Sequence, residues 1–220
     1  MFYPQLFRSG KIGTMEVKNR IVMPAMEVLA AGFSGEMSDT LIRYYEERAK
    51  AGVGLIITAY ASVDDEYCQS FEGAQLKLTH PKHISGMSKL ARTIHKYDAK
   101  VMVQIYMAGR QAVPSKITGK RMIAPSAVGY SLHDQIPEEM TKEEIHKSIE
   151  KFGKSAKYLQ DAGIDGVEVL AAGGYLITQF LSPYTNKRTD EYGGSFENRM
   201  RFLMEIIEEI RRQLREKIFL

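Results

Sequence analysis

A tyrosine behind two glycines is the residue of this sequence best placed to do chemistry. Gly173, Gly174 and Tyr175 directly follow the apolar run GVEVLAA at 166–172, which has the composition of a buried strand. A phenol beyond the end of such a strand can act as a general acid toward a bound substrate. A tyrosine that only packs on its own loop is the more common arrangement, so the spacing leaves both roles open.

Two polar side chains interrupt the apolar pattern of the neighbouring strands. Because side chains alternate along a strand, Gln104 in the run KVMVQIY (100–106) and Glu168 in GVEVLAA face away from their apolar neighbours. Gln104 can offer a donor and an acceptor to a ligand, or it can pair with a polar group of the next strand. Glu168 lies lower on its strand, and a buried carboxylate must be paired, which favours a structural role.

The longest connection in the sequence runs from 107 to 140 and contains three prolines. Loops of this length in compact domains are usually lids or binding loops. Its histidine, His133, is expected to be solvated. No grouping of histidine, cysteine and carboxylates has the spacing of a metal site, and no serine or cysteine lies in a nucleophile elbow. The sequence therefore predicts no metal centre.

Strands and helices alternate along the chain. Short runs rich in valine, isoleucine and leucine predict strands at 20–26, 54–60, 100–106 and 166–172, and a fifth begins at 217–220. Between them apolar residues recur with the helical period of 3.6. The clearest helix should begin at a capping box, Thr141 with Glu144, while another should begin at Ser195 and a third near Pro81.

This alternation predicts βαβ units and a parallel sheet of the α/β class. An open doubly wound sheet usually has a Gly-x-Gly-x-x-Gly turn after its first strand, and MEVLAAGFSGEMS at 26–38 lacks one, which favours a (β/α)8 TIM barrel. Since a complete barrel takes about 250 residues, we expect 1–220 to be its N-terminal portion, with strands one to four and the start of strand five. A hairpin within 6–19 should close the barrel floor.

The overall composition is that of an ordinary globular protein. The 220 residues are 44% hydrophobic and 26% charged with a formal net charge of +3, and no basic run marks a nucleic-acid-binding face. No apolar stretch approaches the roughly 20 residues that a membrane span needs, and a single cysteine excludes an internal disulfide framework. We therefore expect a cytoplasmic protein with neither nucleic acid nor a membrane as its partner.

Five stretches of the sequence occur in an order shared with a known family. They are LF…KIG…VKNRIVMPAM, YYEERAKAGVGLIIT, VQIYMAGR, IAPSA and DGVEVLAAGGYLITQFLSPYTNKRTDEYGGSFENRMRF. In this order they resemble the old yellow enzyme family of FMN-dependent NADH:flavin oxidoreductases over essentially the whole chain. The resemblance implies a TIM barrel that binds FMN and receives electrons from NAD(P)H. It also implies that NKRTDEYGGSFENR shapes one wall of the flavin pocket.

The resemblance assigns flavin contacts to three strand ends. The residues that end the first strand are expected to touch the flavin ring, and they are Pro24, Ala25, Met26 and Glu27. A small residue at the end of the second strand, Ala59, is expected to do the same. Gln104 matches a glutamine that hydrogen-bonds the pyrimidine edge of the isoalloxazine.

The substrate side of the site is assigned in the same way. Tyr175 matches the tyrosine that gives a proton to the substrate opposite the hydride from flavin. Leu170, Gly173 and Arg110 match positions along the substrate. Many family members have histidine, and then histidine or asparagine, at the first two of these positions, and those side chains stabilise charge on the substrate carbonyl oxygen.

Leu170 and Gly173 therefore depart from the common pattern. In lacking the two polar side chains, the sequence resembles the branch of the family that contains 2,4-dienoyl-CoA reductase, 2-enoate reductase and trimethylamine dehydrogenase. Members of that branch continue past the barrel, so the resemblance implies a 4Fe–4S cluster and FAD in a longer protein. Met107 also replaces a common histidine, and Glu27 replaces a neutral or imidazole group near flavin N5, where an anionic carboxylate would disfavour reduced flavin.

Three functions remain open at this point. The first is hydride transfer between reduced FMN and an activated C=C bond of an enoate or an enoyl- or dienoyl-CoA-like small molecule. The second is a single-domain ene-reductase of the old yellow enzyme type, and the third a non-catalytic half-barrel binding or assembly module. The phosphate-binding loops are expected beyond residue 220, so the isolated chain should bind FMN poorly. Its unpaired sheet edges favour a homo-oligomer.

Overall fold

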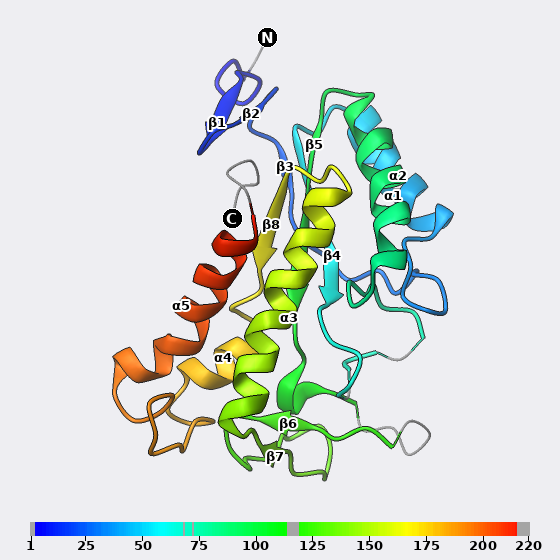
Figure 1. Ribbon diagram of the computed structural model, residues 1–220. Coiled ribbons are helices and arrows are strands. Elements are labelled where there is room, and N and C mark those ends of the chain that lie inside the picture. Colours follow the sequence, from blue (N-terminus) through cyan, green and yellow to red (C-terminus); the bar gives the residue numbers. More distant parts are fainter. Residues whose placement is uncertain (1–2, 68, 72, 114–118, 215–220) are drawn as a thin grey trace.

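The centre of the molecule is a four-stranded parallel sheet. The computed structural model describes residues 3–67, 69–71, 73–113 and 119–214. Its strands lie in the order β3 (Val22–Met23), β4 (Leu55–Ser62), β5 (Lys100–Tyr106) and β8 (Gly166–Val169) (Figure 1). They coincide with the four predicted apolar runs, although the first and last are shorter than those runs. The predicted start of a fifth strand at 217–220 lies outside the described residues.

A helix follows each strand, as a series of βαβ units requires. The helices are α1 (Asp39–Lys50), α2 (Ile84–His95), α3 (Lys142–Asp161), the short α4 (Leu176–Leu181) and α5 (Phe196–Gln213). The predicted capping box of Thr141 and Glu144 starts α3, and the Ser195 side chain caps α5. Pro81 lies in a 3-10 turn, η1 (Pro81–His83), that leads into α2. The predicted helix starts are therefore confirmed.

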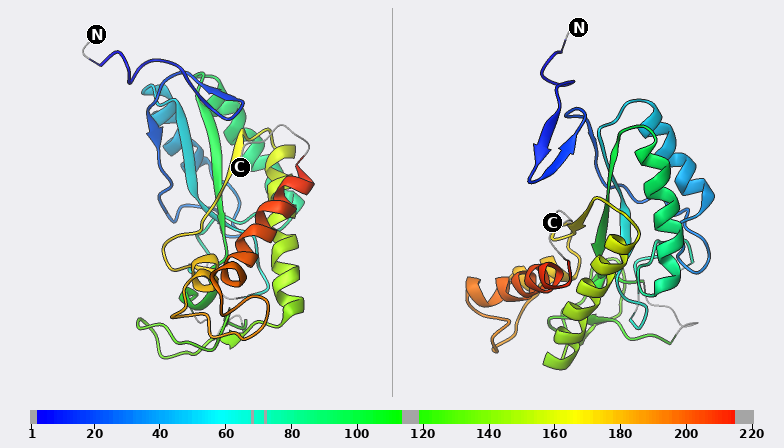
Figure 2. Two further views of the ribbon diagram at one scale, coloured as in Figure 1. Left: turned by 90° about the vertical axis from the view of Figure 1, so that its left-hand side faces the viewer. Right: turned by 45° about the horizontal axis from the view of Figure 1, so that its top comes forward.

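The two faces of the sheet have different neighbours. On the outer face Val101, Val103 and Ile105 of β5 are buried against α1, α2 and α3, which run along that face in both views of Figure 2. On the inner face, Leu55 of β4 and Met102 of β5 form a separate apolar cluster. The predicted alternation along β5 is therefore confirmed.

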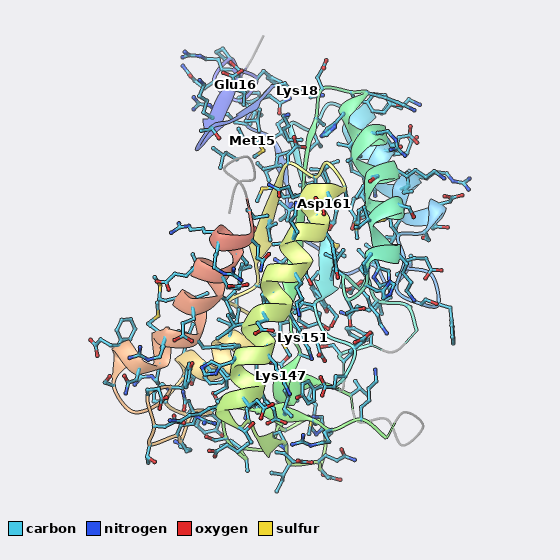
Figure 3. The ribbon with its side chains drawn as sticks, in the orientation of Figure 1. Met15, Glu16, Lys18, Lys147, Lys151 and Asp161 are labelled. Carbon is cyan, nitrogen blue, oxygen red and sulfur yellow. The ribbon has the colours of Figure 1, made fainter. Side chains whose placement is uncertain are left out.

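A hairpin closes the N-terminal end of the inner face. It consists of β1 (Gly10–Ile12) and β2 (Met15–Val17), which pair antiparallel. Met15 and Val17 pack on the cluster of Leu55 and Met102, and Figure 3 shows Met15 at this end of the sheet. The hairpin and α4 lie at opposite ends of the central sheet (Figure 1). The predicted closure of the barrel floor is confirmed, and the opposite end remains for a site.

β4 contains a register shift that changes which residues face inward. Thr58 pairs with Val103, but the next pair joins Ala61 with Ile105, so β4 has one residue more than β5 over this stretch. A bulge of this kind re-aims the side chains that follow it. Ile57 packs on the inner cluster, whereas Ala59 is 1% exposed and packs under the helices. The next inward side chain is Tyr60.

Arg188 ties the long loop after β5 to the loop after α4. Within the long loop, β6 (Ile123–Ala124) and β7 (Glu138–Glu139) form a two-stranded parallel sheet. The Arg188 side chain is 5% exposed, donates to the carbonyl oxygens of Pro125 and Met140, and pairs with Asp190. Buried charges of this kind need such partners. The polar stretch after α4 therefore has a structural reason of its own.

Asp165 joins three elements at the N-terminal end of the sheet. Its carboxylate accepts hydrogen bonds from His95 Nε2 at 2.6 Å, Lys100 Nζ at 2.9 Å and the Val101 N–H at 3.0 Å. Burial of the carboxyl raises its pKa, but these donors outweigh burial and hold the pKa of Asp165 below its usual value.

No helix in the described part of the chain is long and apolar enough to cross a membrane.

Candidate active site

Tyr175 lies at the C-terminal end of the sheet, at the start of α4. The turn before it requires glycine twice, since Gly173 has a φ of 67° and Gly174 a φ of 80°. Side chains other than glycine rarely adopt this left-handed conformation. A Cβ on Gly174 would also lie 2.2 Å from Nε2 of Gln111. The two glycines thus let the chain leave β8 sharply and carry Tyr175 over the strand ends.

Two glutamines fix this turn to the loop that follows β5. Nε2 of Gln111 donates to the carbonyl oxygen of Gly173 at 2.9 Å. Gln179, which is 1% exposed, donates to the carbonyl oxygens of Gly174 and Ala108 at 2.8 and 3.1 Å. Since each glutamine bonds backbone rather than a mobile side chain, the position of Tyr175 is set by two elements at once.

Three tyrosines meet at this end of the sheet. Tyr60 lies in the bulged stretch of β4, Tyr106 is the last residue of β5, and Tyr175 is the N-cap residue of α4. The ring of Tyr106 lies 4.4 Å from that of Tyr60 and 5.0 Å from that of Tyr175, edge-on to the latter. The hydroxyls of Tyr60 and Tyr175 are 3.1 Å apart, within hydrogen-bonding distance. The cluster therefore holds two phenols next to each other at the mouth of the inner face.

The environment keeps Tyr60 and Tyr106 protonated. Burial raises the pKa of Tyr60, and the hydrogen bond to Tyr175 raises it further. Burial also raises the pKa of Tyr106, whose hydroxyl donates to Oε1 of Gln75 at 2.8 Å. Both phenols are neutral at neutral pH, as an unperturbed tyrosine is, and their raised pKa values make them weaker acids.

Gln104 and Glu168 face each other on the inner side of the sheet. Nε2 of Gln104 donates to Oε1 of Glu168 at 2.6 Å, across the β5–β8 pair. This is the neighbouring-strand partner that the sequence left as one of two alternatives for Gln104. The bond occupies one donor of the amide, and the side chain remains 8% exposed on the inner face. Glu168 has the paired, structural position predicted for it.

Glu27 turns its carboxylate back onto its own backbone. Oε1 accepts the N–H groups of Val28 and Leu29, both at 2.9 Å, and Leu29 has a positive φ of 50°. Oε2 is buried without a hydrogen-bond partner among the described residues. Burial raises the pKa of Glu27 against the opposing effect of these N–H donors and of the Gln75 side chain. The carboxylate is thus directed at the N–H groups of its own strand end.

The other residues predicted to contact the flavin differ in how exposed they are and in which face of the sheet they lie on. Pro24 and Met26 are exposed at the end of β3, and Met26 is 61% exposed, while Ala25 is half-buried. Ala59 faces the helix layer because of the bulge in β4, and its N–H is bonded to the Tyr45 hydroxyl at 2.8 Å. Ala59 is therefore not positioned to contact a ring on the inner face through its side chain or its N–H.

The chemistry of this surface fits a flavin ring. Exposed apolar groups of Pro24 and Met26 lie at the end of one strand, and the amide of Gln104 lies two strands away on the inner face. A flat aromatic ring system with a polar edge needs such an apolar surface beside a hydrogen-bonding amide. No group of three or more histidine, cysteine or acidic residues in the described chain has the arrangement of a metal site.

The predicted substrate positions are only partly brought together. Leu170 packs against the same apolar cluster, which includes Tyr106, as Tyr60 and Tyr175 do, and Gly173 lies in the turn before Tyr175. The Arg110 guanidinium donates to the carbonyl oxygen of Gly129 at 2.6 Å and lies 5.6 and 5.7 Å from the rings of Tyr130 and Tyr184. Arg110 thus holds the long loop in this structure.

His133 is not simply solvated as predicted. It is half-buried, its Nε2 lies 3.0 Å from the carbonyl oxygen of Arg110, and its ring is edge-on to Tyr130. The expectation was wrong because the long loop folds back on its own first residues. His133 therefore supports the loop that holds Arg110.

Sequence reasoning missed Tyr60, Tyr106 and Gln75. Tyr106 and Tyr60 close two neighbouring strand runs in the sequence, so a shared position at the strand ends was a usable signal. The inward direction of Tyr60 was not visible, because strict alternation from Leu55 and Ile57 would turn Ala59 inward instead. Gln75 lies in an irregular segment with no periodicity to place it.

Comparison with known proteins identifies the family. The family model described as NADH:flavin oxidoreductase / NADH oxidase matches residues 5–219. The NADH oxidase of Thermoanaerobacter brockii is 46% identical over 215 residues, which cover 97% of this chain and 33% of that protein.

Two solved structures are similar over nearly the whole chain. A 2-naphthoyl-CoA reductase in complex with 2-naphthoyl-CoA has a TM-score of 0.89 at 34% identity, covering 98% of this chain and 34% of that one. Old yellow enzyme from Pichia sp. AKU4542 has a TM-score of 0.89 at 31% identity, covering 95% and 56%.

The chain thus spans about a third of the length of the first two relatives and just over half of the third. The sheet, its helices and the hairpin beneath it are part of a (β/α)8 barrel of the old yellow enzyme type. This chain belongs to the NADH:flavin oxidoreductase / NADH oxidase family.

Proposed function

We propose that the protein is an FMN-dependent oxidoreductase that transfers hydride between reduced flavin and an activated C=C bond, with NAD(P)H as the ultimate donor. The observation that carries the proposal is Tyr175, a phenol held over the C-terminal strand ends by two left-handed glycines and two glutamines. Active sites of barrel enzymes lie at this end of the strands. Membership of the flavin oxidoreductase family supports the choice of cofactor.

The chain's own residues would hold one side of the flavin ring. Pro24 and Met26 offer apolar surface, Ala25 and Glu27 adjoin them, and Gln104 offers its amide to the pyrimidine edge. Reduced FMN supplies a hydride to the substrate. Because Glu27 is turned toward its own backbone, its part in the site is to shape the strand end rather than to place a charge beside the ring.

Tyr175 supplies the proton in this proposal. When hydride reaches one alkene carbon, the other carbon must receive a proton, and the hydroxyl of Tyr175 gives it. The hydride brings the electron pair of the first new C–H bond, and the π electron pair of the alkene forms the second with the proton of Tyr175. The phenolate that remains takes a proton from its surroundings. General acid catalysis of this type typically contributes 10²–10⁴-fold in rate.

An unsaturated thioester or enoate is the substrate class that the site suits best. Leu170 and Gly173 offer no polar side chain to a carbonyl, so a simple enone would lack an anchor there. One similar structure holds 2-naphthoyl-CoA, by its name an unsaturated thioester. Arg110, at the rim beside two tyrosine rings, is the nearby cation that would meet an acidic part of such a substrate.

We infer that the chain is the N-terminal part of the barrel in a longer protein with a 4Fe–4S cluster and FAD. Support comes from the relatives that are about three times as long as the chain. We also infer a cytoplasmic location and self-association through sheet edges. Iron and sulfide analysis of the purified protein tests the cluster, and light scattering tests the oligomer.

A single-domain ene-reductase is the second candidate. Its support is the similarity to old yellow enzyme, of which the chain covers 56%. Such a protein would contain FMN without iron or FAD. A non-catalytic half-barrel module would contain none of the three.

Anaerobic reduction and reoxidation test the proposed activity. The purified full-length protein, rather than residues 1–220 alone, is reduced with NADH or NADPH and then mixed with an unsaturated thioester or, as a matched control, its saturated counterpart. We expect the visible flavin absorbance to return only with the unsaturated compound. Absence of bound flavin, or no reoxidation by any enoate or unsaturated thioester, would contradict the proposal.

A further inference from the structure

The hydroxyls of Tyr60 and Tyr175 form a pair that joins two distant parts of the chain. They lie 3.1 Å apart although the residues are 115 positions apart in sequence. Their rings are 5.5 Å apart, and Tyr106 packs on both. Tyr60 comes from β4 and Tyr175 from the turn after β8, with β5 between those strands. The pair is therefore built by the fold and not by local sequence.

A hydrogen bond between two phenols has a direction. One hydroxyl donates to the other, and the accepting hydroxyl keeps its own proton for a different partner. Tyr60 and Tyr175 are both partly buried and both pack against the apolar cluster of Tyr106, Ala108, Ala112 and Met122. An arrangement in which Tyr60 donates leaves the proton of Tyr175 free to point at a substrate.

We propose that Tyr60 is a positioning residue that donates a hydrogen bond from its hydroxyl to the Tyr175 oxygen and so aims the acid and stabilises the phenolate left after proton transfer. This inference rests on the proposed function, in which Tyr175 protonates the substrate. The proton balance is complete. Tyr175 gives its proton to the substrate carbon, and the Tyr175 phenolate, still hydrogen-bonded by Tyr60, then takes a proton from water.

The bulge in β4 is the structural feature that makes this pair. Without the extra residue between Thr58 and Ala61, Tyr60 would point to the helix layer and Ala59 to the inner face. A bulge leaves a residue out of the ladder, and bulges occur next to active sites where they re-aim a side chain. Here the re-aimed side chain is the one whose hydroxyl reaches Tyr175.

Packing alone would need only the rings of these tyrosines. Tyr60→Phe keeps the ring and removes the hydroxyl, so it separates a packing role from a hydrogen-bonding role. Tyr106→Phe is the matched control, because Tyr106 touches both rings while its hydroxyl points to Gln75 rather than to Tyr175. Thermal unfolding of each variant shows whether the fold is retained.

The first readout does not depend on turnover. The protein is labelled with tyrosine carrying carbon-13 at Cζ, and the Tyr175 signal is assigned by its loss in Tyr175→Phe. We expect Tyr60→Phe to shift the Tyr175 Cζ signal, because the oxygen loses a hydrogen-bond donor, and Tyr106→Phe to shift it much less. An unchanged Tyr175 signal in Tyr60→Phe would overturn the pairing.

The second readout is a double-mutant cycle on the flavin-loaded protein. Tyr60→Phe should slow substrate-dependent reoxidation by about ten- to a hundredfold, since one hydrogen bond to a developing phenolate is lost, and leave reduction by NAD(P)H unchanged. In the Tyr175→Phe background the same change should have little further effect. The role of Tyr60 would be overturned if Tyr60→Phe slowed reoxidation as much in the Tyr175→Phe background as in the wild type. It would also be overturned if Tyr60→Phe had no effect while Tyr175→Phe slowed reoxidation.

Failure of the two proposals can be told apart. If Tyr175→Phe leaves reoxidation unchanged, the proposed acid is wrong, and the positioning role of Tyr60 is wrong with it whatever the carbon-13 signal shows. If Tyr175→Phe is slow and Tyr60→Phe is normal, the acid stands and only the role of Tyr60 is wrong.

Discussion

Gln111 holds the carbonyl oxygen of Gly173 at 2.9 Å, which ties the loop after β5 to the turn that carries Tyr175. The same amide nitrogen is the atom that a Cβ on Gly174 would meet at 2.2 Å. A Cβ on Gly174 would therefore displace the Gln111 amide that fastens the turn. The position of the proposed acid depends on this close approach.

Gly174→Ala should destabilise the protein and displace Tyr175. Gly174 and Gly194 have the same φ of 80°, but a Cβ on Gly194 would meet no atom within 4 Å. Both alanine variants should lose about 1–2 kcal/mol of unfolding free energy from the left-handed backbone. Only Gly174→Ala should also slow substrate-dependent flavin reoxidation. Equal kinetics for the two variants would show that the turn does not position the site.

Gln104→Leu should weaken flavin binding. The substitution removes the amide from the inner face and takes the donor from the Glu168 carboxylate. Loss of a buried hydrogen-bonding partner costs about 1–3 kcal/mol, or roughly ten- to a hundredfold in affinity. Flavin retained after dialysis of the wild type and the variant measures the effect. Unchanged retention would mean that the amide serves Glu168 alone.

Glu27→Gln should change how stability depends on pH. Burial raises the pKa of Glu27, so the folded state holds this proton more tightly than the unfolded state does. Its contribution is therefore fully present below the unfolded value of 4.5 and is lost as pH rises through the raised folded pKa. Thermal midpoints of both proteins from pH 4 to pH 8 should favour the variant increasingly at higher pH, and parallel curves would contradict the assignment.

Asp165→Asn should change the pH dependence of stability in the opposite direction. The pKa of Asp165 is held below 3.8 by its donors, so its stabilisation is present above that value and is lost as pH falls through the lower folded pKa. At neutral pH the variant should lose about 1.5–3 kcal/mol, the range for hydrogen bonds to a charged group. Asp161→Asn removes an exposed pair with Lys157 and should cost at most about 1 kcal/mol. Equal losses would contradict the role of Asp165.

The fold was predictable because its signals are local and repeated. The alternation of Val101, Val103 and Ile105, and the capping box of Thr141 and Glu144, each fix an element without long-range information. The hairpin beneath the sheet was predictable for the same reason. Its packing partners, Leu55 and Met102, follow from the inner face of the strands.

The candidate site was less predictable because it depends on one irregularity and on contacts between distant loops. The bulge in β4 exchanges the directions of Ala59 and Tyr60, and the sequence IITAYAS at 56–62 contains no pattern that predicts a bulge. The hydrogen bonds of Arg110 with Gly129 and of His133 with Arg110 are likewise tertiary contacts, which local sequence patterns do not predict. Sequence patterns place residues on elements, whereas these positions are set by how elements meet.

The most direct test of the central claim is the pair of half-reactions in Tyr175→Phe. Tyr97→Phe is a suitable control, because Tyr97 lies in the turn before β5, at the opposite end of the sheet from Tyr175, and its hydroxyl donates to Glu46 of α1. Stopped-flow measurement should show unchanged flavin reduction by NAD(P)H and reoxidation by an unsaturated thioester slowed by roughly 10²–10⁴-fold, because only the second step needs the proton. If both half-reactions slow alike, or neither slows, Tyr175 is a packing residue and not the acid.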